Sequence, residues 1–227
     1  METEIRQIKQ QLRMAMNGIV SSSMREKGVN YRVNFGLTAP LIKRIADTHD
    51  KRADLAEYLW NEQVRESKIL ATLLYPENEF TETVAGKWID SLEQTEIADQ
   101  LCFNLAGKRP YAIELALRYT ASDTPVKRYA GFQLLTRAMH NKFYLTEAQT
   151  EKLITDTLSV NQPDTALFIK AAAINCLKFA MRQHPDTAQL IVQTVKNSLY
   201  TQPENEWIRN IYDELNTELE FLEESIF

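Results

Sequence analysis

Apolar residues recur at intervals of three and four along almost the whole of this 227-residue chain, and they seldom alternate with polar ones. This spacing gathers them on one side of an α-helix, whereas a half-buried strand needs strict alternation. Only six glycines interrupt the pattern. The sequence therefore predicts an all-α fold without a β-sheet.

The predicted helices are short, and prolines stand close to their ends, where a missing N–H costs little. Asp50 is placed to cap the helix that runs to about Trp60. Further helices are expected over residues 39–48, 64–75, 80–91, 94–106, 110–121, 125–140, 146–158, 164–183, 186–199 and 204–222. Pro76, Pro110, Pro125, Pro163, Pro185 and Pro203 mark their connections.

Three of these segments resemble one another: KILATLLY (68–75), KRYAGFQLL (127–135) and KAAAINCL (170–177). Each has a lysine three residues before a small alanine, which lets neighbouring helices approach closely. Ala130 and Ala173 are 43 residues apart, an interval typical of HEAT and armadillo repeats. We therefore expect a HEAT-like, armadillo-type α-α superhelix of stacked antiparallel helix pairs, formed by one domain over residues 1–227.

Cysteine and histidine usage predicts neither a disulfide nor a metal site. Cys102 and Cys176 each lie in an apolar run, as buried thiols do in a reducing compartment. None of the three histidines is at zinc-ligand spacing from a cysteine, so no metal or other cofactor is predicted. No apolar run reaches the roughly 18 residues of a membrane span, and the N-terminus does not resemble a signal peptide. A cytoplasmic protein that does not bind membranes is expected.

Charge is distributed unevenly. The whole chain carries −5, but residues 204–227 hold eight acids and one base, a charge of −7, so residues 1–203 carry +2. A mildly basic body followed by an acidic last helix is compatible with an anionic partner. The acidic helix could also screen such a partner's site.

Four stretches, taken in order, resemble the DNA alkylation repair family, whose members are HEAT-like helical DNA glycosylases. They are NFGLTAPLIKRIAD (34–47), LAEYLWNEQVRESKILATLLY (55–75), TEIADQLCFNLAGK (95–108) followed by VKRYAGFQLL (126–135), and LFIKAAAINCLKFAMRQHP (167–185). The resemblance implies a helical arch around double-stranded DNA and excision of purines alkylated at N3 or N7. It also implies an aspartate near the glycosidic bond, an arginine near the DNA backbone and aromatic rings against the deoxyribose.

Carried over residue by residue, the family's Trp-Asp-x-x-Asp segment falls on Thr95 to Asp99. Asp99 is therefore the candidate catalytic residue. The resemblance places Thr95 and Asn175 where the family has its two active-site tryptophans, so excision is expected to be weak or absent. The alternative function is a non-catalytic scaffold that binds a protein partner or unusual DNA through its concave face.

Candidate DNA-binding residues come from three features. Lys68, Lys127 and Lys170 occupy equivalent places in the three similar helices and would form a phosphate-binding ridge, with Arg128 as the backbone arginine. Lys108 and Arg109 open a predicted helix whose N-terminus could bind phosphate. Arg25, Lys27 and Arg32 are expected in a mobile basic loop beside Ser21–Ser23 and Gly28.

Each of these residues also has a structural interpretation. The lysines could form a solvated stripe that pairs with acids such as Glu66 or Asp164. Asp99 could form an ion pair with Arg128 that orients two helices. Trp60, Tyr75 and Trp88 lie at helical spacing among leucines and are predicted to be core residues.

Overall fold

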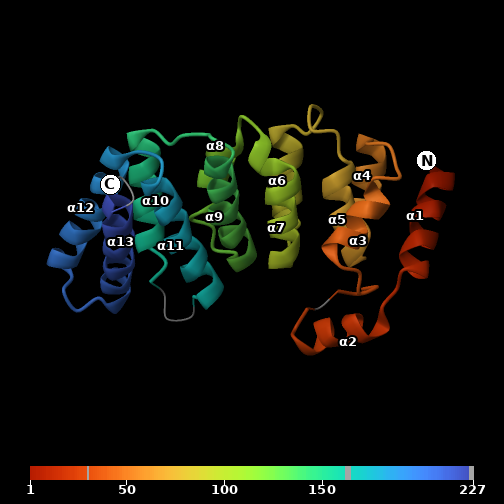
Figure 1. The fold of residues 1–227 in the computed structure, drawn as a ribbon, viewed down its shortest axis with the longest axis horizontal. Coiled ribbons are helices and arrows are strands. Elements are labelled where there is room, and N and C mark those ends of the chain that lie inside the picture. The colour runs from red at the N-terminus through yellow and green to blue at the C-terminus, as the bar shows by residue number, and fades with distance from the viewer. Residues whose placement is uncertain (30, 162–164, 225–227) are drawn as a thin grey trace. The chain divides into compact units, whose positions relative to one another are not determined.

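The computed structural model describes residues 1–29, 31–161 and 165–224, so Pro163 and Asp164 lie outside the described residues. Within these ranges there are thirteen α-helices and one 3-10 helix, and the only β-pairing is an isolated bridge between Val33 and Val64 (Figure 1). The helices are α1 (Glu2–Met14), α2 (Gly18–Glu26), α3 (Ala39–Ala46), α4 (Ala53–Trp60), α5 (Arg65–Leu74), α6 (Glu82–Asp90), α7 (Thr95–Asn104), η1 (Ala106–Lys108), α8 (Ala112–Tyr119), α9 (Pro125–His140), α10 (Glu147–Leu158), α11 (Leu167–Met181), α12 (Pro185–Thr201) and α13 (Glu206–Glu224).

The all-α prediction is confirmed, because its spacing argument depends only on local periodicity. One detail was wrong: Asp50 does not cap the helix that ends at Trp60. That helix, α4, begins at Ala53, and its N-cap is Arg52, whose side chain makes no capping hydrogen bond. No helix in the described part of the chain is both long and apolar enough to cross a membrane.

The chain forms two compact units. Unit 1 comprises Met1–Trp88 and Asp99–Ala106, and unit 2 comprises Ile89–Ala98 and Gly107–Phe227. Helix α7 contributes residues to both.

Unit 2 contains two layers of helices. In the A layer, α10 packs against both α8 and α12; in the B layer, α11 packs against both α9 and α13. Helices within the B layer run parallel, since contacting residues keep a constant separation in sequence. Tyr129 and His140 of α9 meet Phe168 and Phe179 of α11, each pair 39 residues apart. Successive helix pairs stacked in this way form the HEAT-like architecture that the sequence predicts.

Small residues let the helices of unit 2 approach closely, as the repeated alanines predict. Ala130 and Ala173 are completely buried. A side chain at Gly131 of α9 would place its Cβ 2.6 Å from the backbone nitrogen of Thr120, at the end of α8. Because nothing larger than glycine fits there, this position sets the distance between α8 and α9.

Unit 1 is built around an aromatic core between α4, α5 and α6. The rings of Trp60 and Trp88 stack with centroids 4.0 Å apart. Tyr75 and Phe80 meet Trp88 edge to face, with centroids 5.5 and 5.2 Å away. All four side chains are buried, so the predicted core assignment of the tryptophans and Tyr75 is confirmed.

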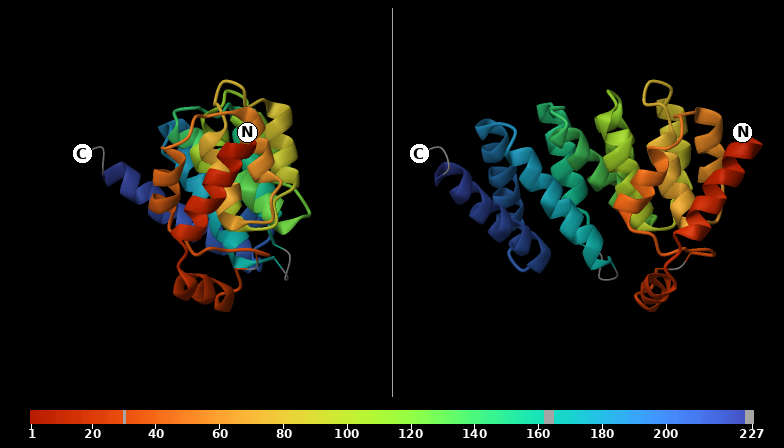
Figure 2. Two further views of the ribbon diagram at one scale, coloured as in Figure 1. Left: turned by 90° about the vertical axis from the view of Figure 1, so that its right-hand side faces the viewer. Right: turned by 45° about the vertical axis from the view of Figure 1, so that its right-hand side comes forward.

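Helix α2 of unit 1 lies crosswise to α1 and α3, beyond their ends (Figures 1 and 2). The segment from residue 33 to 37 fastens it there: the backbone N–H of Asn17 donates to the Phe35 carbonyl at 2.8 Å, and Ser21 Oγ donates to the Asn34 carbonyl at 2.8 Å. Gly36, with φ of 74°, makes the closest approach, because a Cβ there would overlap the Asn17 carbonyl and lie 2.7 Å from the Ser21 nitrogen.

Substitution of two glycines should separate backbone strain from steric overlap at this contact. Gly28→Ala imposes a side chain at φ of 84° in open space, so it should cost about 1 kcal/mol of unfolding free energy. Gly36→Ala adds the overlap with α2 and should cost roughly 2 to 4 kcal/mol. Chemical denaturation of both variants measures the difference. Equal losses would mean that α2 shifts to admit the methyl group without cost.

Candidate nucleic-acid interface

An open groove of about 710 Å³ runs between α11 and α13 in the B layer of unit 2. We call it the 11/13 groove. Its wall on α11 includes Lys170, Asn175 and Lys178, and its wall on α13 includes Trp207, Asn210 and Glu214. With Asn161, the lining holds two ammonium groups, three amides and one aromatic side chain, which are groups that bind phosphates and polar base edges. It also holds two carboxylates, those of Glu206 and Glu214.

Helical spacing explains which side chains of α11 reach the groove. Lys170, Ile174 and Lys178 are four residues apart, so they lie along one face, and Asn175 lies beside them. The opposite face of α11 carries Ala173, Cys176 and Leu177, all buried in the core. Asn175, aligned by resemblance with a family tryptophan, is therefore exposed in a polar groove.

Acidic side chains of α13 pair with basic side chains of α11. Lys178 Nζ lies 2.5 Å from a carboxylate oxygen of Glu214, and Arg182 Nε donates to Glu218 Oε1 at 2.7 Å. The hydrogen bond that Arg182 donates to the Glu218 carboxylate raises the pKa of Arg182. Lys170 Nζ lies over the Trp207 ring, 5.5 Å from its centroid. One edge of the groove is therefore partly neutralised by the protein's own carboxylates.

Sequence reasoning did not find Lys178, Arg182 or their partners. A signal was present: the two bases are four residues apart, the two acids are four residues apart, and 36 residues separate both pairs. Such matched spacing is typical of parallel neighbouring helices. It becomes informative only when α11 and α13 are known to be neighbours.

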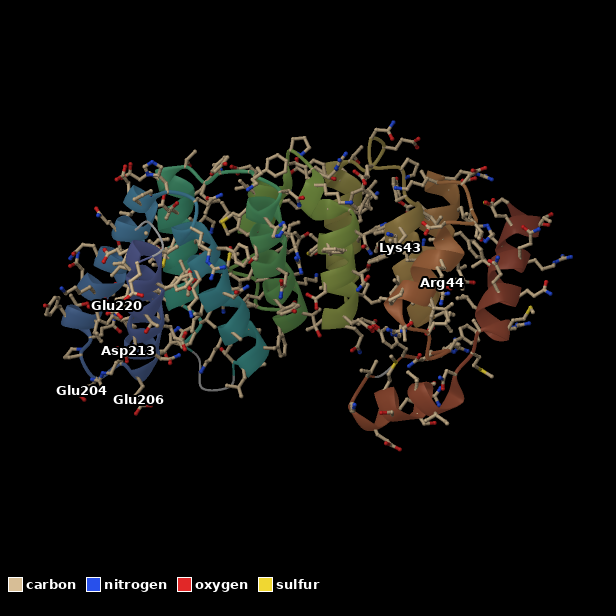
Figure 3. All side chains as sticks on the ribbon, viewed as in Figure 1. Lys43, Arg44, Glu204, Glu206, Asp213 and Glu220 are labelled. Carbon is tan, nitrogen blue, oxygen red and sulfur yellow. The ribbon has the colours of Figure 1, made fainter. Side chains whose placement is uncertain are left out.

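The acidic last helix is part of the folded unit. Trp207 Nε1 donates to the Thr157 carbonyl at 3.1 Å, and the buried side chains of Ile208, Ile211 and Leu215 face the core. Among the acids of this segment Glu218 is buried, whereas Glu204, Glu206, Asp213 and Glu220 are exposed at this end of unit 2 (Figure 3). Unit 2 therefore has an acidic outer end beside the basic wall of the groove.

Arg128 joins three helix ends in unit 2. Its Nε donates to the Thr120 carbonyl at 3.0 Å, and its Nη2 donates to the Asp156 carbonyl at 3.1 Å and to Ser159 Oγ at 2.6 Å. Partial burial lowers its pKa. The buried Asp156 carboxylate accepts from Thr120 Oγ at 2.6 Å and from Lys152 Nζ at 2.9 Å. Arg128 thus binds backbone carbonyls of α8 and α10, and its role at a DNA backbone stays a prediction.

The three predicted ridge lysines contact protein groups. Lys68 Nζ donates to the Trp60 carbonyl at 2.6 Å and lies 5.1 Å from the centroid of the Trp60 ring, in unit 1. Lys127 Nζ lies 2.9 Å from a carboxylate oxygen of Asp90, in unit 2. Of the three, Lys170 lines the 11/13 groove. The structure thus brings Lys170 together with Asn175 and Lys178, and it gives Lys68 and Lys127 separate surroundings.

Two local expectations for basic residues were wrong. Lys108 and Arg109 do not open a helix: Lys108 ends the short η1, and α8 starts at Ala112 after a turn. Arg25 and the three serines do not form a loop, because they belong to α2, whose C-cap is Lys27. A run of serines has low helix propensity, but anchoring of α2 on the 33–37 segment overrides it. Arg32 does lie in a connection outside the helices.

Asp99 is half-buried in the middle of α7 and belongs to unit 1. The neighbouring face of α7 is apolar, and Cys102 is buried there. Both cysteines are free thiols, and burial raises the pKa of Cys176 to about 12. Cys176 is therefore protonated at neutral pH, which excludes it as a thiolate nucleophile.

Comparison with known proteins agrees with this architecture. Residues 8–204 match the family model described as DNA alkylation repair enzyme. A solved structure described as belonging to "a new family of proteins related to the HEAT-like repeat DNA glycosylases with affinity for branched DNA structures" superimposes with a TM-score of 0.71. It shares 17% sequence identity, and the match covers 84% of this chain and 81% of that one. No curated protein sequence matches the chain.

Proposed function

Because the chain belongs to the DNA alkylation repair enzyme family, we propose that it binds double-stranded and branched DNA and excises alkylated purines weakly or not at all. The single observation that carries this proposal is the chemistry of the 11/13 groove. A polar amide, Asn175, stands between Lys170 and Lys178 on an open surface.

DNA binding is supported by the way these lysines are presented. Both lie on one face of a well-packed helix, so their ammonium groups keep a defined spacing against a phosphate backbone. The structural relative, by its own description, has affinity for branched DNA. The two buried thiols fit the reducing conditions of the cytoplasm, where we place the protein.

Weak excision is supported by the residue at position 175. The family's activity, as the resemblance implies it, needs electron-rich ring faces against a developing sugar cation. An asparagine amide offers hydrogen bonds and no ring face. Binding can therefore persist where the rate of glycosidic bond cleavage is low.

Removing the two groove lysines should weaken DNA binding and its dependence on salt. Each phosphate contact contributes about 0.9 to the slope of log affinity against log salt, so Lys170→Ala with Lys178→Ala should reduce the slope by roughly 1.8. Fluorescence anisotropy with labelled duplex DNA at several salt concentrations measures this. Lys196→Ala, on the A-layer helix α12, is the matched control and should leave the slope nearly unchanged.

A third variant, measured in the same titration, should strengthen duplex binding instead of weakening it. Glu214→Gln removes the carboxylate that lies 2.5 Å from Lys178 and should tighten duplex binding, since the lysine no longer has to give up an ion pair. The groove is not the interface if the lysine variants bind duplex DNA as wild type does. If wild-type protein ignores both duplex and branched DNA at low salt, DNA binding itself is wrong.

A further inference from the structure

Positive charge is concentrated at the start of the chain. Residues 1–32 hold six basic and three acidic side chains, a net charge of +3, while residues 33–203 hold 19 basic and 20 acidic ones, a net charge of −1. All the net positive charge of residues 1–203 therefore lies on α1, α2 and the connection after α2. This region belongs to unit 1, and the 11/13 groove belongs to unit 2.

The basic side chains of this region are presented to solvent. Arg6, Arg13, Arg25, Lys27 and Arg32 are exposed, and none of them forms an ion pair with a carboxylate among the described residues. Lys9 differs, because its Nζ lies 2.6 Å from a Glu62 carboxylate oxygen. A polyanion can therefore approach at least five guanidinium or ammonium groups without displacing an internal partner.

A groove follows the outer face of α1. It has a volume of about 740 Å³, and its lining includes Arg6, Gln10, Arg13, Met14 and Tyr58. Arg6, Gln10 and Arg13 fall on one helical face, since they are three and four residues apart. Lys9 also lines the groove; its Nζ donates to the Tyr58 hydroxyl at 3.1 Å and lies 5.3 Å from the centroid of that ring. Tyr58 of α4 remains 39% exposed, so part of its side chain is available at the wall of the groove. Glu2 also lines the end of the groove that holds Met1.

Exposed apolar side chains follow in the sequence from Met14, which lines the groove. Met14, Met16 and Ile19 are 80%, 60% and 85% exposed, although side chains of this kind are normally covered. Met14 is the last residue of α1, Met16 lies in the turn between the two helices, and Ile19 lies in the first turn of α2. The contact at Gly36 holds this turn in place. Apolar groups on a fixed turn beside exposed cations are suited to the faces of unstacked bases, whose phosphates the cations can bind.

We propose that this N-terminal surface, formed by Arg6, Arg13, Met14, Met16, Ile19 and Tyr58, holds an unpaired DNA strand at a branch point. Arginines along α1 bind the phosphates, and the apolar turn with the Tyr58 ring contacts the base faces. A fully paired duplex keeps its base faces stacked and gains only the phosphate contacts. The surface therefore selects branched over fully paired DNA, which deepens the proposed function and rests on it.

The test compares a forked DNA with a blunt duplex of the same length, using wild type and paired variants in anisotropy titrations. Met16→Ser with Ile19→Ser should raise the Kd for the fork about tenfold, the effect of losing roughly one base-stacking contact, and leave the duplex Kd unchanged. Tyr200→Ser, which removes an exposed ring from α12, should change neither value.

A second pair of variants tests the phosphate contacts. Arg6→Ala with Arg13→Ala should weaken fork binding more than Lys43→Ala with Arg44→Ala, which removes two exposed charges from α3 of the same unit (Figure 3). Equal losses would mean a general charge effect and would overturn the proposal. Equal affinity of the wild-type protein for fork and duplex would also overturn this proposal. The proposed function, DNA binding, would be unaffected by that result.

Vesicles containing phosphatidylserine provide the remaining comparison, because apolar and basic groups together also suit an anionic membrane. If Met16→Ser with Ile19→Ser abolishes vesicle binding and spares fork binding, the surface is a membrane site and the proposal is wrong. If wild type binds neither fork nor duplex, this inference fails together with the proposed function.

Discussion

Release of N3- or N7-alkylated purines from methylated duplex DNA is expected to be slow or undetectable. With Thr95 and Asn175 at the two aromatic positions, the sugar cation loses two ring contacts worth about 0.5 to 2 kcal/mol each. At roughly 1.4 kcal/mol per factor of ten, the rate should fall by about one to three orders of magnitude below that of an enzyme with both rings. Single-turnover measurement of released base checks this.

Asp99→Asn provides the matched variant for that assay. Any residual release should vanish in it, since the remaining candidate for offsetting the developing positive charge is the Asp99 carboxylate. The variant must keep the wild-type circular dichroism spectrum and melting temperature, because Asp99 is half-buried in α7. Rapid release by wild type would show that Thr95 and Asn175 do not occupy the aromatic positions, and release unaffected in the variant would exclude Asp99 as the catalytic residue.

Glu66→Ala should destabilise unit 1 more than any other single substitution considered. The side chain is completely buried, and its carboxylate accepts hydrogen bonds from the backbone N–H of Phe35 at 3.1 Å, from that of Leu37 at 3.2 Å and from Arg65 Nη1 at 3.0 Å. Removal leaves the buried Arg65 without this carboxylate and takes the acceptor away from one buried and one half-buried backbone amide. Breaking such a buried pair costs roughly 3 to 5 kcal/mol.

Urea denaturation followed by circular dichroism measures that loss. The exposed Glu79→Ala is the control and should stay within about 0.5 kcal/mol of wild type. Combining Glu66→Leu with Arg65→Leu should recover part of the stability, because no buried charge then remains. A loss below about 1 kcal/mol in Glu66→Ala would mean that water reaches the site and replaces the carboxylate.

The surroundings of Glu66 also show that a family resemblance can single out a stretch of sequence without showing what its residues do. The stretch from Asn34 to Asp47 was one of four that resemble the family, and the structure shows what its first residues do. Phe35 and Leu37 bind the buried carboxylate, while Gly36 lies against α2. This part of the pattern maintains the fold of unit 1.

Local periodicity by itself determined the helices, because burying one face of each helix requires apolar residues every three or four positions whatever the neighbours are. The interval between repeated alanines likewise indicated stacked pairs, since small residues permit close packing only when helices are adjacent. Buried cysteines and tryptophans followed from the same pattern. Each of these conclusions depends on residues within one helix or one repeat.

Only the tertiary structure decided which groups each charged side chain contacts. Lys68, Lys127 and Lys170 are equivalent in sequence, yet one contacts the Trp60 carbonyl, one pairs with Asp90 and one lines a groove. Likewise, the acids of α13 could not be assigned to Lys178 and Arg182 until the two helices were known to lie side by side. A charged side chain acquires its role from groups that distant parts of the chain bring within a few ångströms, and no local pattern encodes that distance.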